Sequence, residues 1–173
     1  MKPCIPIKGH SQLRKGRFSL GGASYFLTLC ARGQPSDLAR DAIFGRLMEL
    51  VAALDREQVM SVRAMTLMPD HLHAIVRLGD AAALSDAIRL FKGRASVILR
   101  QAEMRWQKGG YYDHRLRAGE PLAPVFRYIF MNPYWAGLCQ GGQKWPFFRC
   151  CRQDWEWFQH DLNNEMPYPE WLR

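Results

Sequence analysis

The 173-residue sequence predicts an α+β fold, a ferredoxin-like or RRM-like split βαβ sandwich, from the order of its apolar patterns. Strand-like segments lie at residues 23–32, 60–67 and 71–78, and apolar residues at helical spacing follow the first and the last of them. Strand, helix, hairpin, helix is the order of a split βαβ unit. We therefore expect an antiparallel sheet with helices on one face and a functional site on the other.

The first strand and the first helix are each predicted by a regular spacing. From Tyr25 to Ala31, apolar residues occupy every second position, as in a half-buried strand. After a turn around Pro35, apolar residues repeat every three or four positions. They predict a helix that ends near Asp55: Ile43, Phe44, Leu47, Leu50, Val51 and Leu54.

The hairpin carries the most informative motif of the chain. Its two strands are joined by a tight turn at residues 68–70, and the second strand has one wholly apolar face. His71 and His73 lie on its other face, which we expect to point away from the helices. Two histidines at this spacing can hold one metal ion between them, although isolated pairs of this kind also occur by chance.

The second half of the chain is predicted to be mostly helical. Apolar residues step by four and three over residues 84–102, which predicts a long helix. Gly93 lies inside it at a cost of about 1 kcal/mol relative to alanine, which suggests close packing or backbone approach there. A short extended piece at 111–116 precedes a third helix over about 121–132, which we expect Pro133 to end.

We expect three regions: a basic N-terminal arm at residues 1–20, one domain at residues 21–140, and an aromatic extension at residues 141–173 that packs on the domain. No apolar run approaches the roughly 20 residues that cross a bilayer, and no secretory signal is visible. These features predict a soluble, cytoplasmic protein without a membrane partner. The net charge of +8 favours a polyanionic partner, or a solvated basic surface.

The third helix adds two polar residues to the histidine pair. Its buried stripe comprises Leu122, Val125, Phe126 and Ile129, and Tyr128 and Asn132 share one flank of that stripe. Tyr128 could act as a phenolic nucleophile, and Asn132 Oδ1 could bind a metal. The same residues are also compatible with an ordinary core tyrosine and a helix stop. Asn132 precedes a proline, which disfavours helical geometry at that position.

Together these motifs resemble a known family. Residues 68–73, Met-Pro-Asp-His-Leu-His, and residues 128–133, Tyr-Ile-Phe-Met-Asn-Pro, resemble the single-tyrosine HUH transposases, and among them the bacterial REP-associated tyrosine transposases. The resemblance covers about residues 14–140. It is supported by the segments 21–26, 91–94, 106–114 and 132–138. The family usually has Asn where Asp70 stands, and insertion-sequence members have Gln where Asn132 stands.

The resemblance implies a transposase-like enzyme that cleaves single-stranded DNA at REP-type hairpins. His71, His73 and Asn132 would hold Mg²⁺ or Mn²⁺, and Tyr128 would attack phosphorus to give a 5′-phosphotyrosine and a free 3′-hydroxyl. Reversal would rejoin strands. The partner would be single-stranded or hairpin DNA, and the protein a monomer or a homodimer. Expected contacts with the DNA backbone are Arg14, Lys15, Arg17, Lys92 and Arg94.

Three other interpretations remain open. A non-catalytic RRM-like or domesticated binder of hairpin DNA or RNA would share the topology, but should carry aromatic residues where the histidines stand. A two-tyrosine initiator is suggested by Tyr111 and Tyr112, which lack a supporting helix. A relaxase would need a third histidine, for which His114 is the candidate.

Overall fold

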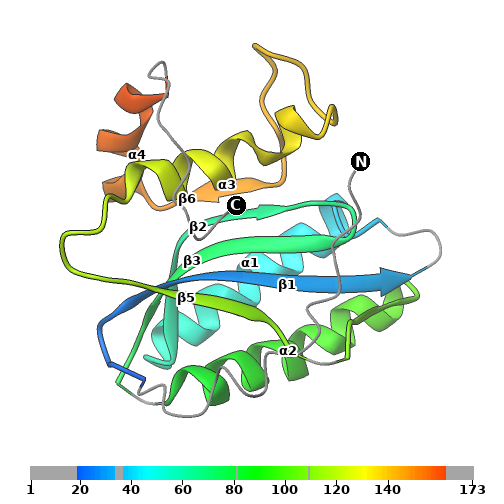
Figure 1. Ribbon diagram of the computed structural model, residues 1–173. Helices are drawn as coiled ribbons and strands as arrows, with labels where there is room; N and C mark the ends of the chain where they lie inside the picture. The colour runs from blue at the N-terminus through cyan, green and yellow to red at the C-terminus, as the bar shows by residue number, and fades with distance from the viewer. Residues whose placement is uncertain (1–18, 34–36, 81, 109, 163–173) are drawn as a thin grey trace.

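The structure is a computed structural model that describes residues 19–33, 37–80, 82–108 and 110–162. Nearly all of the predicted N-terminal arm, including Arg14, Lys15 and Arg17, lies outside the described residues. In chain order the elements are β1 (Ser24–Gly33), α1 (Asp41–Arg56), β2 (Met60–Leu67), β3 (His71–Leu78), α2 (Leu84–Gln101), β4 (Met104–Trp106), β5 (Tyr112–Leu116), α3 (Ala123–Trp135), β6 (Phe148–Cys150), α4 (Arg152–Phe158) and a 3-10 turn (Gln159–Asp161) (Figure 1).

The strands form one antiparallel sheet in the order β4-β1-β3-β2-β6. β3 lies in the middle of this order. Both β4 and β5 pair with the remaining edge of β1, β5 along residues 24–28 and β4 along residues 31–33. The predicted fold class, an α+β fold with an antiparallel sheet, is confirmed. β4 and β6 are additions that the apolar patterns did not predict.

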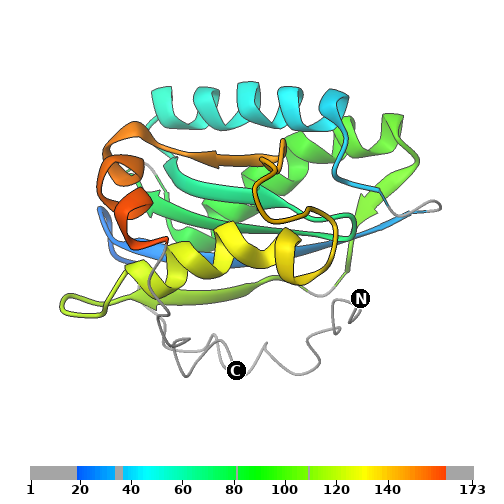
Figure 2. The ribbon, with the colours of Figure 1, turned by 90° about the horizontal axis from the view of Figure 1, so that it is seen from above.

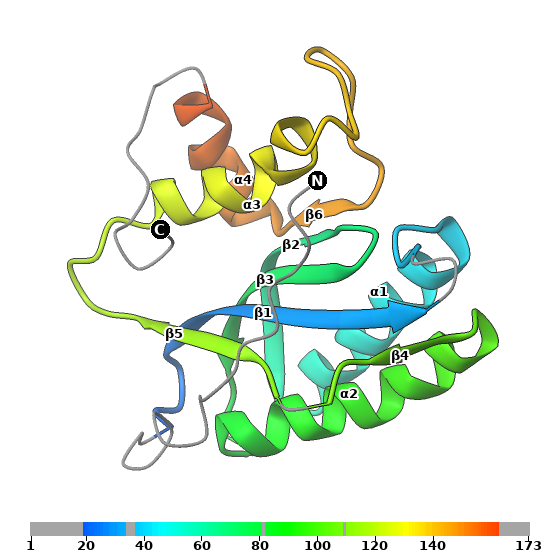
Figure 3. The ribbon, with the colours of Figure 1, turned by 45° about the vertical axis from the view of Figure 1, so that its right-hand side comes forward.

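Helices α1 and α2 cover one face of the sheet (Figure 3). The apolar residues of β3, Leu72 through Leu78 at alternate positions, are buried in the core between the sheet and these helices, as predicted. The predicted stripe of α1 supplies Ile43, Leu47, Val51 and Leu54 to the same core. The alternation along the strand and the helical spacing of α1 in the sequence therefore predict this layer.

Helix α3 lies across the opposite face, beside α4 (Figure 2). A second, smaller core forms beneath it from Phe26, Ala64, Ile75, Leu116, Val125, Phe126, Ile129 and Phe158. The histidine face is therefore partly covered by the helix that carries Tyr128. This arrangement adds a helix to the face that we expected to hold only the site.

Pro133 does not end α3, in contrast to the prediction. The helix continues to Trp135, with Pro133 inside it and Asn132 in helical geometry. Pro133 lies in the last turn and is buried, so the one hydrogen bond that its missing N–H removes is tolerated. The backbone N–H of Ala136 still donates to the Asn132 carbonyl. Tyr128 and Asn132 are consequently one helical turn apart.

Residues 148–158 attach the end of the described chain to the sheet. β6 pairs with β2 from Ala64 to Thr66. From the neighbouring position on β2, Arg63 reaches α4 and donates two hydrogen bonds to Asp154, at 2.8 and 2.6 Å. Of the helices among the described residues, none combines the length and the apolar character that a membrane span requires.

Candidate catalytic and metal-binding site

Four side chains that the sequence singled out meet on one face of the sheet. His71 and His73 come from β3, and Tyr128 and Asn132 come from α3, which packs against β2 and β3. The Tyr128 hydroxyl lies 3.4 Å from His73 Nε2. Tyr128 and Asn132 are also linked by a hydrogen bond between their side chains. The structure therefore joins the two halves of the motif, which are 55 positions apart.

The two imidazoles turn the same nitrogen toward each other. The Nε2 atoms of His71 and His73 are 3.0 Å apart. Each opposite nitrogen is occupied: His71 Nδ1 is 2.6 Å from Asp70 Oδ1, and His73 Nδ1 is 2.9 Å from Thr28 Oγ1. Because a carboxylate only accepts hydrogen bonds, it assigns the proton of a neutral His71 to Nδ1 and leaves the Nε2 lone pair available.

This geometry fits a divalent ion. A nitrogen–nitrogen separation of 3.0 Å matches two neighbouring ligands of an octahedral ion at roughly 2.1 Å from each. Outer partners such as Asp70 and Thr28 are the groups that normally orient metal-bound histidines. The donor set and its orientation therefore suit the metal that the sequence predicted.

Burial keeps the His73 imidazole uncharged. Its side chain is 4% exposed and its ring stacks on Phe26 with centroids 5.5 Å apart. Burial, with a smaller contribution from His71, lowers the pKa of His73 well below its ordinary value. The imidazole is thus uncharged at neutral pH, as metal binding requires.

The phenol of Tyr128 lies beside the histidine nitrogens but is not itself activated. Burial raises the pKa of Tyr128, and the hydrogen bond with Asn132 offsets only part of that increase. The ring is held against His73 at 5.1 Å and against Phe26 at 5.9 Å between centroids. Trp135, which is 46% exposed, lies 6.3 Å from the Tyr128 ring. The phenol is therefore held beside the histidines, and it is protonated at neutral pH.

The candidate for a third protein ligand is the uncharged amide oxygen of Asn132. No group of three or more His, Cys, Asp or Glu suited to a metal occurs within the part of the chain that the structure describes. Asn132 contacts the same phenol as His73, so its amide lies on the same side of α3. Its Oδ1 can complete a set of two nitrogens and one oxygen, with water and phosphate oxygens in the remaining positions.

Other residues that the sequence singled out lie elsewhere. Lys92 and Arg94 are on α2, in the helix layer on the far side of the sheet from α3 (Figure 3). Arg94 forms an ion pair with Glu57 at 2.7 Å. His114 bonds Glu120 at 2.8 Å, so it does not join the histidine pair.

Sequence reasoning missed the residues that support the site. Thr28 pairs with His73 across β1 and β3, and Thr66 pairs with it across β2 and β3. The Thr66 hydroxyl is buried without a hydrogen-bond partner among the described residues. Alternation along β1 already places Thr28 on the histidine face, but only the strand register shows that it lies opposite His73.

The fold resembles a solved transposase structure. A REP-associated tyrosine transposase bound to a REP hairpin matches with a TM-score of 0.64 and 22% identity, over 76% of this chain and 79% of that chain. A candidate transposase from Deinococcus radiodurans R1 matches with a TM-score of 0.47 and 13% identity, over 72% of this chain and 97% of that chain. No match was found among curated proteins.

A comparison of the sequence with family models identifies the family, whereas the structural match shows only the fold. The model described as "Transposase IS200 like" matches residues 24–118. That range is more than half of the chain and includes β1 through β5 with both histidines, although it ends before Tyr128. The histidine pair, its oriented nitrogens and this match together show that the chain belongs to the IS200-like transposase family.

Proposed function

We propose that this protein is a metal-dependent endonuclease and strand transferase that cleaves single-stranded DNA at REP-type hairpins through a 5′-phosphotyrosine. The observation that carries the proposal is the approach of the Tyr128 hydroxyl to the paired Nε2 atoms of His71 and His73. Membership of the transposase family supports the DNA substrate. A REP hairpin is the ligand of a protein with the same fold, which supports the choice of target.

Each site residue has one role in the proposed reaction. His71, His73 and Asn132 would hold Mg²⁺ or Mn²⁺, which would supply polarisation of the scissile phosphate and a positive charge beside it. Tyr128 Oη forms a bond to phosphorus while the bond between phosphorus and the 3′-oxygen breaks. The products are a 5′-phosphotyrosine and a free 3′-hydroxyl. Attack by another 3′-hydroxyl reverses the step and releases Tyr128.

The phenolic proton has to leave during the attack. Because burial raises the pKa of Tyr128, the hydroxyl keeps its proton at neutral pH in the free protein. In the proposed site His73 Nε2 is a ligand and Asn132 is not a base, so neither residue takes the proton. The departing 3′-oxygen needs one proton, which balances the one that Tyr128 gives up. Asn132 holds the hydroxyl in place through its hydrogen bond.

Lys92 and Arg94, the proposed DNA contacts within the described residues, lie away from the candidate site. Contacts by Lys92 and Arg94 require a hairpin stem that extends past the edge of the sheet onto the layer of α1 and α2. The site itself lies under α3. We therefore propose that these two residues act on the stem only and not on the scissile strand.

The test is the formation of a covalent adduct. The protein is incubated with a REP-type hairpin oligonucleotide that carries single-stranded flanks, in Mn²⁺, because imidazole nitrogens bind transition-metal ions better than Mg²⁺. We expect an adduct that mass spectrometry maps to Tyr128, that Tyr128→Phe abolishes and that a chelator prevents. An adduct that survives Tyr128→Phe would move the nucleophile elsewhere. Tight hairpin binding without any adduct would identify a non-catalytic binding protein instead.

A further inference from the structure

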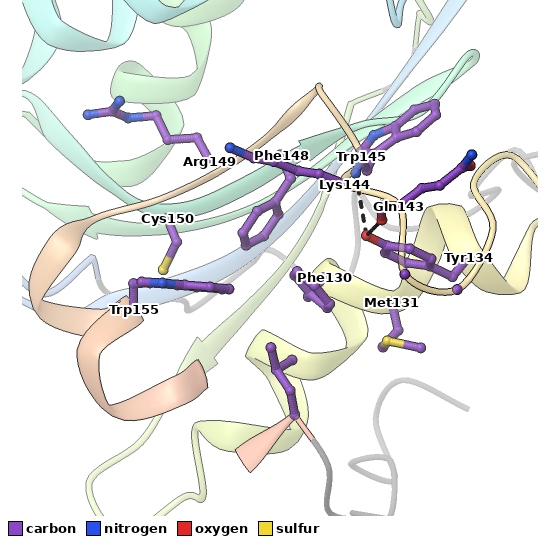
Figure 4. Close-up of a pocket in the computed structure, with 13 residues that line it drawn as sticks. Phe130, Met131, Tyr134, Gln143, Lys144, Trp145, Phe148, Arg149, Cys150 and Trp155 are labelled. Atoms are coloured by element: carbon purple, nitrogen blue, oxygen red, sulfur yellow. Dashed lines mark hydrogen bonds between the residues drawn. The ribbon is translucent and has the colours of Figure 1, made fainter. Parts of the chain in front are cut away.

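A second concave surface lies on the other flank of α3. We call it the α3–α4 pocket, and its volume is about 790 Å³ (Figure 4). Phe130 is two positions after Tyr128, which turns it about 200° around the helix, away from the site described above. Five aromatic residues line the pocket: Phe130, Tyr134, Trp145, Phe148 and Trp155. The proposed cleavage mechanism uses none of them.

The walls of the pocket are held in place by hydrogen bonds. The Tyr134 hydroxyl donates to the Gln143 carbonyl at 2.8 Å and accepts from the Trp145 backbone N–H at 3.4 Å. Trp145 Nε1 donates to the Leu67 carbonyl of β2 at 3.1 Å. These bonds tie the loop after α3 both to the helix and to the sheet. The pocket is therefore part of the fold and does not depend on a ligand to form.

The rings inside the pocket suit a flat, conjugated ligand. Phe130 stacks on Tyr134 with centroids 5.5 Å apart, and Phe148 meets Phe130 edge-on at 5.1 Å. Trp155 lies 6.2 Å from Phe148 and is only partly buried. Its indole N–H donates no hydrogen bond to any described residue, although indole N–H groups usually find a partner. Stacking on such rings and one hydrogen bond are what a nucleobase offers.

The charged residues that line the pocket are all basic. Lys144 and Arg149 line it, and none of its lining residues is acidic. Both cations are exposed, and neither forms an ion pair with a carboxylate within the described part of the chain. Cations without a counterion attract anions such as phosphate.

We infer that the α3–α4 pocket binds one unstacked nucleotide of the single-stranded DNA flanking the hairpin, with its base against the aromatic rings and its phosphate at Lys144 and Arg149. The inference rests on the proposed function, because it takes DNA as the substrate. It adds a second contact on the strand, separated from Tyr128 only by the width of α3. A strand that crosses α3 can occupy both sites at once, which fixes where it is cut.

The charge is tested first, on the full-length protein with a fluorescently labelled oligothymidine. Lys144→Ala combined with Arg149→Ala should weaken binding about tenfold and reduce the slope of log K against log salt by roughly one. The control is Arg152→Ala, which removes an exposed cation that pairs with Glu156 at the start of α4, outside the pocket. The control should bind within twofold of the unchanged protein. Equal losses in both variants would overturn the inference.

The base is tested separately, by its removal. An abasic position scanned along the flank should weaken binding at least fivefold at one position, and that loss should disappear in Trp155→Leu. Because Trp155 also packs on Phe158, the variant requires a check of folding by circular dichroism. If it is unfolded, 4-thiothymidine at the sensitive position should crosslink to Phe148 or Trp155 in the unchanged protein. Crosslinks confined to residues outside the pocket would contradict the inference.

The outcomes separate this inference from the proposed function. A Tyr128 adduct together with unchanged binding by the Lys144 and Arg149 variant would overturn the pocket and leave the function standing. Crosslinks at Trp155 without any Tyr128 adduct would support the pocket and overturn the cleavage chemistry. A change in sedimentation caused by Lys144→Ala would show that the pocket instead binds a second copy of the chain.

Discussion

The two faces of β3 show how one strand serves two purposes. Leu72, Ala74, Val76 and Leu78 point into the larger core, beneath α1 and α2. On the other face His71 and His73 are followed by Ile75, so that polar residues and the smaller core share a surface. The larger core supplies apolar burial, which stabilises the fold. The smaller core buries fewer apolar residues, because His71 and His73 occupy positions on its face of the sheet and point toward α3.

The largest expected effect separates neighbouring residues on these two faces. His73→Ala should lower the affinity for Mn²⁺ at least 100-fold, because a positioned ligand is lost, while the protein stays folded. Leu72→Ala should do the opposite and destabilise the fold by about 2–5 kcal/mol, with the metal affinity of the folded protein unchanged. Calorimetric Mn²⁺ titration and urea denaturation measure the two quantities. If His73→Ala unfolded the protein, the division between the faces would be wrong.

The smaller core lies beside an ion pair that should add to its stability. Arg63 reaches from β2 to Asp154 of α4, and the two side chains are 23% and 6% exposed. Burial alone would raise the pKa of Asp154, but hydrogen bonds from Arg63 and Cys151 lower it below its ordinary value. A lowered pKa means that Asp154 adds stability above the pKa of an unfolded carboxyl. This contribution disappears as the pH falls through the folded value.

We therefore expect urea denaturation of the unchanged protein to show a loss of stability on the acid side. Asp154→Asn should cost about 3 kcal/mol at pH 7, because it leaves Arg63 half-buried without its anion. It should also flatten the acid part of the curve. Asp86→Asn, which alters an exposed pair on α2, serves as the control. A curve for Asp154→Asn that keeps the same acid slope would contradict the assignment.

A moderate effect is expected from the carboxylate behind His71. Asp70→Ala should weaken Mn²⁺ binding about 10-fold, because the outer partner no longer orients the imidazole. Asp70→Asn should bind nearly as well, since its amide oxygen can still accept the Nδ1 hydrogen bond. Asp55→Ala, on the exposed side of α1, is the control. Equal affinities for all three variants would show that Asp70 has no such role.

The smallest change in stability is expected from a substitution of Gly93 in α2. A Cβ at Gly93 would meet nothing within 4 Å, so the close packing that the sequence suggested is absent. Gly93→Ala should therefore raise the free energy of unfolding by about 1 kcal/mol without changing metal affinity. Gly79→Ala should be destabilising, because its Cβ would overlap the Gln58 carbonyl. A destabilised Gly93→Ala protein would mean that α2 makes a contact that this geometry lacks.

Local periodicity was sufficient for the parts of the molecule that repeat. It predicted the alternation on β3, the stripe of α1 and the shared flank of Tyr128 and Asn132. It could not predict β4 and β6, which have three residues each and exist only because distant strands pair with them. A three-residue segment is too short to show a period.

The position where α3 ends and the contact between Thr28 and His73 could not be predicted without knowledge of the tertiary structure. Proline normally ends a helix, but the burial of Pro133 in the last turn outweighs that local preference. Thr28 could be assigned to the correct face from β1 alone. Its contact with His73 depends on the register between two strands that are 45 positions apart. The register arises from the whole sheet, so no single segment encodes it.

The distance in sequence between the hairpin and α3 has a consequence for how the protein folds. The β2–β3 hairpin is local and can form early, whereas the contact between His73 and Tyr128 closes a loop of 55 positions. We expect α3 to dock late in folding. A newly made chain would then contain the folded hairpin before His73 and Tyr128 come together. Late docking would leave the proposed cleavage site incomplete until the rest of the fold has formed.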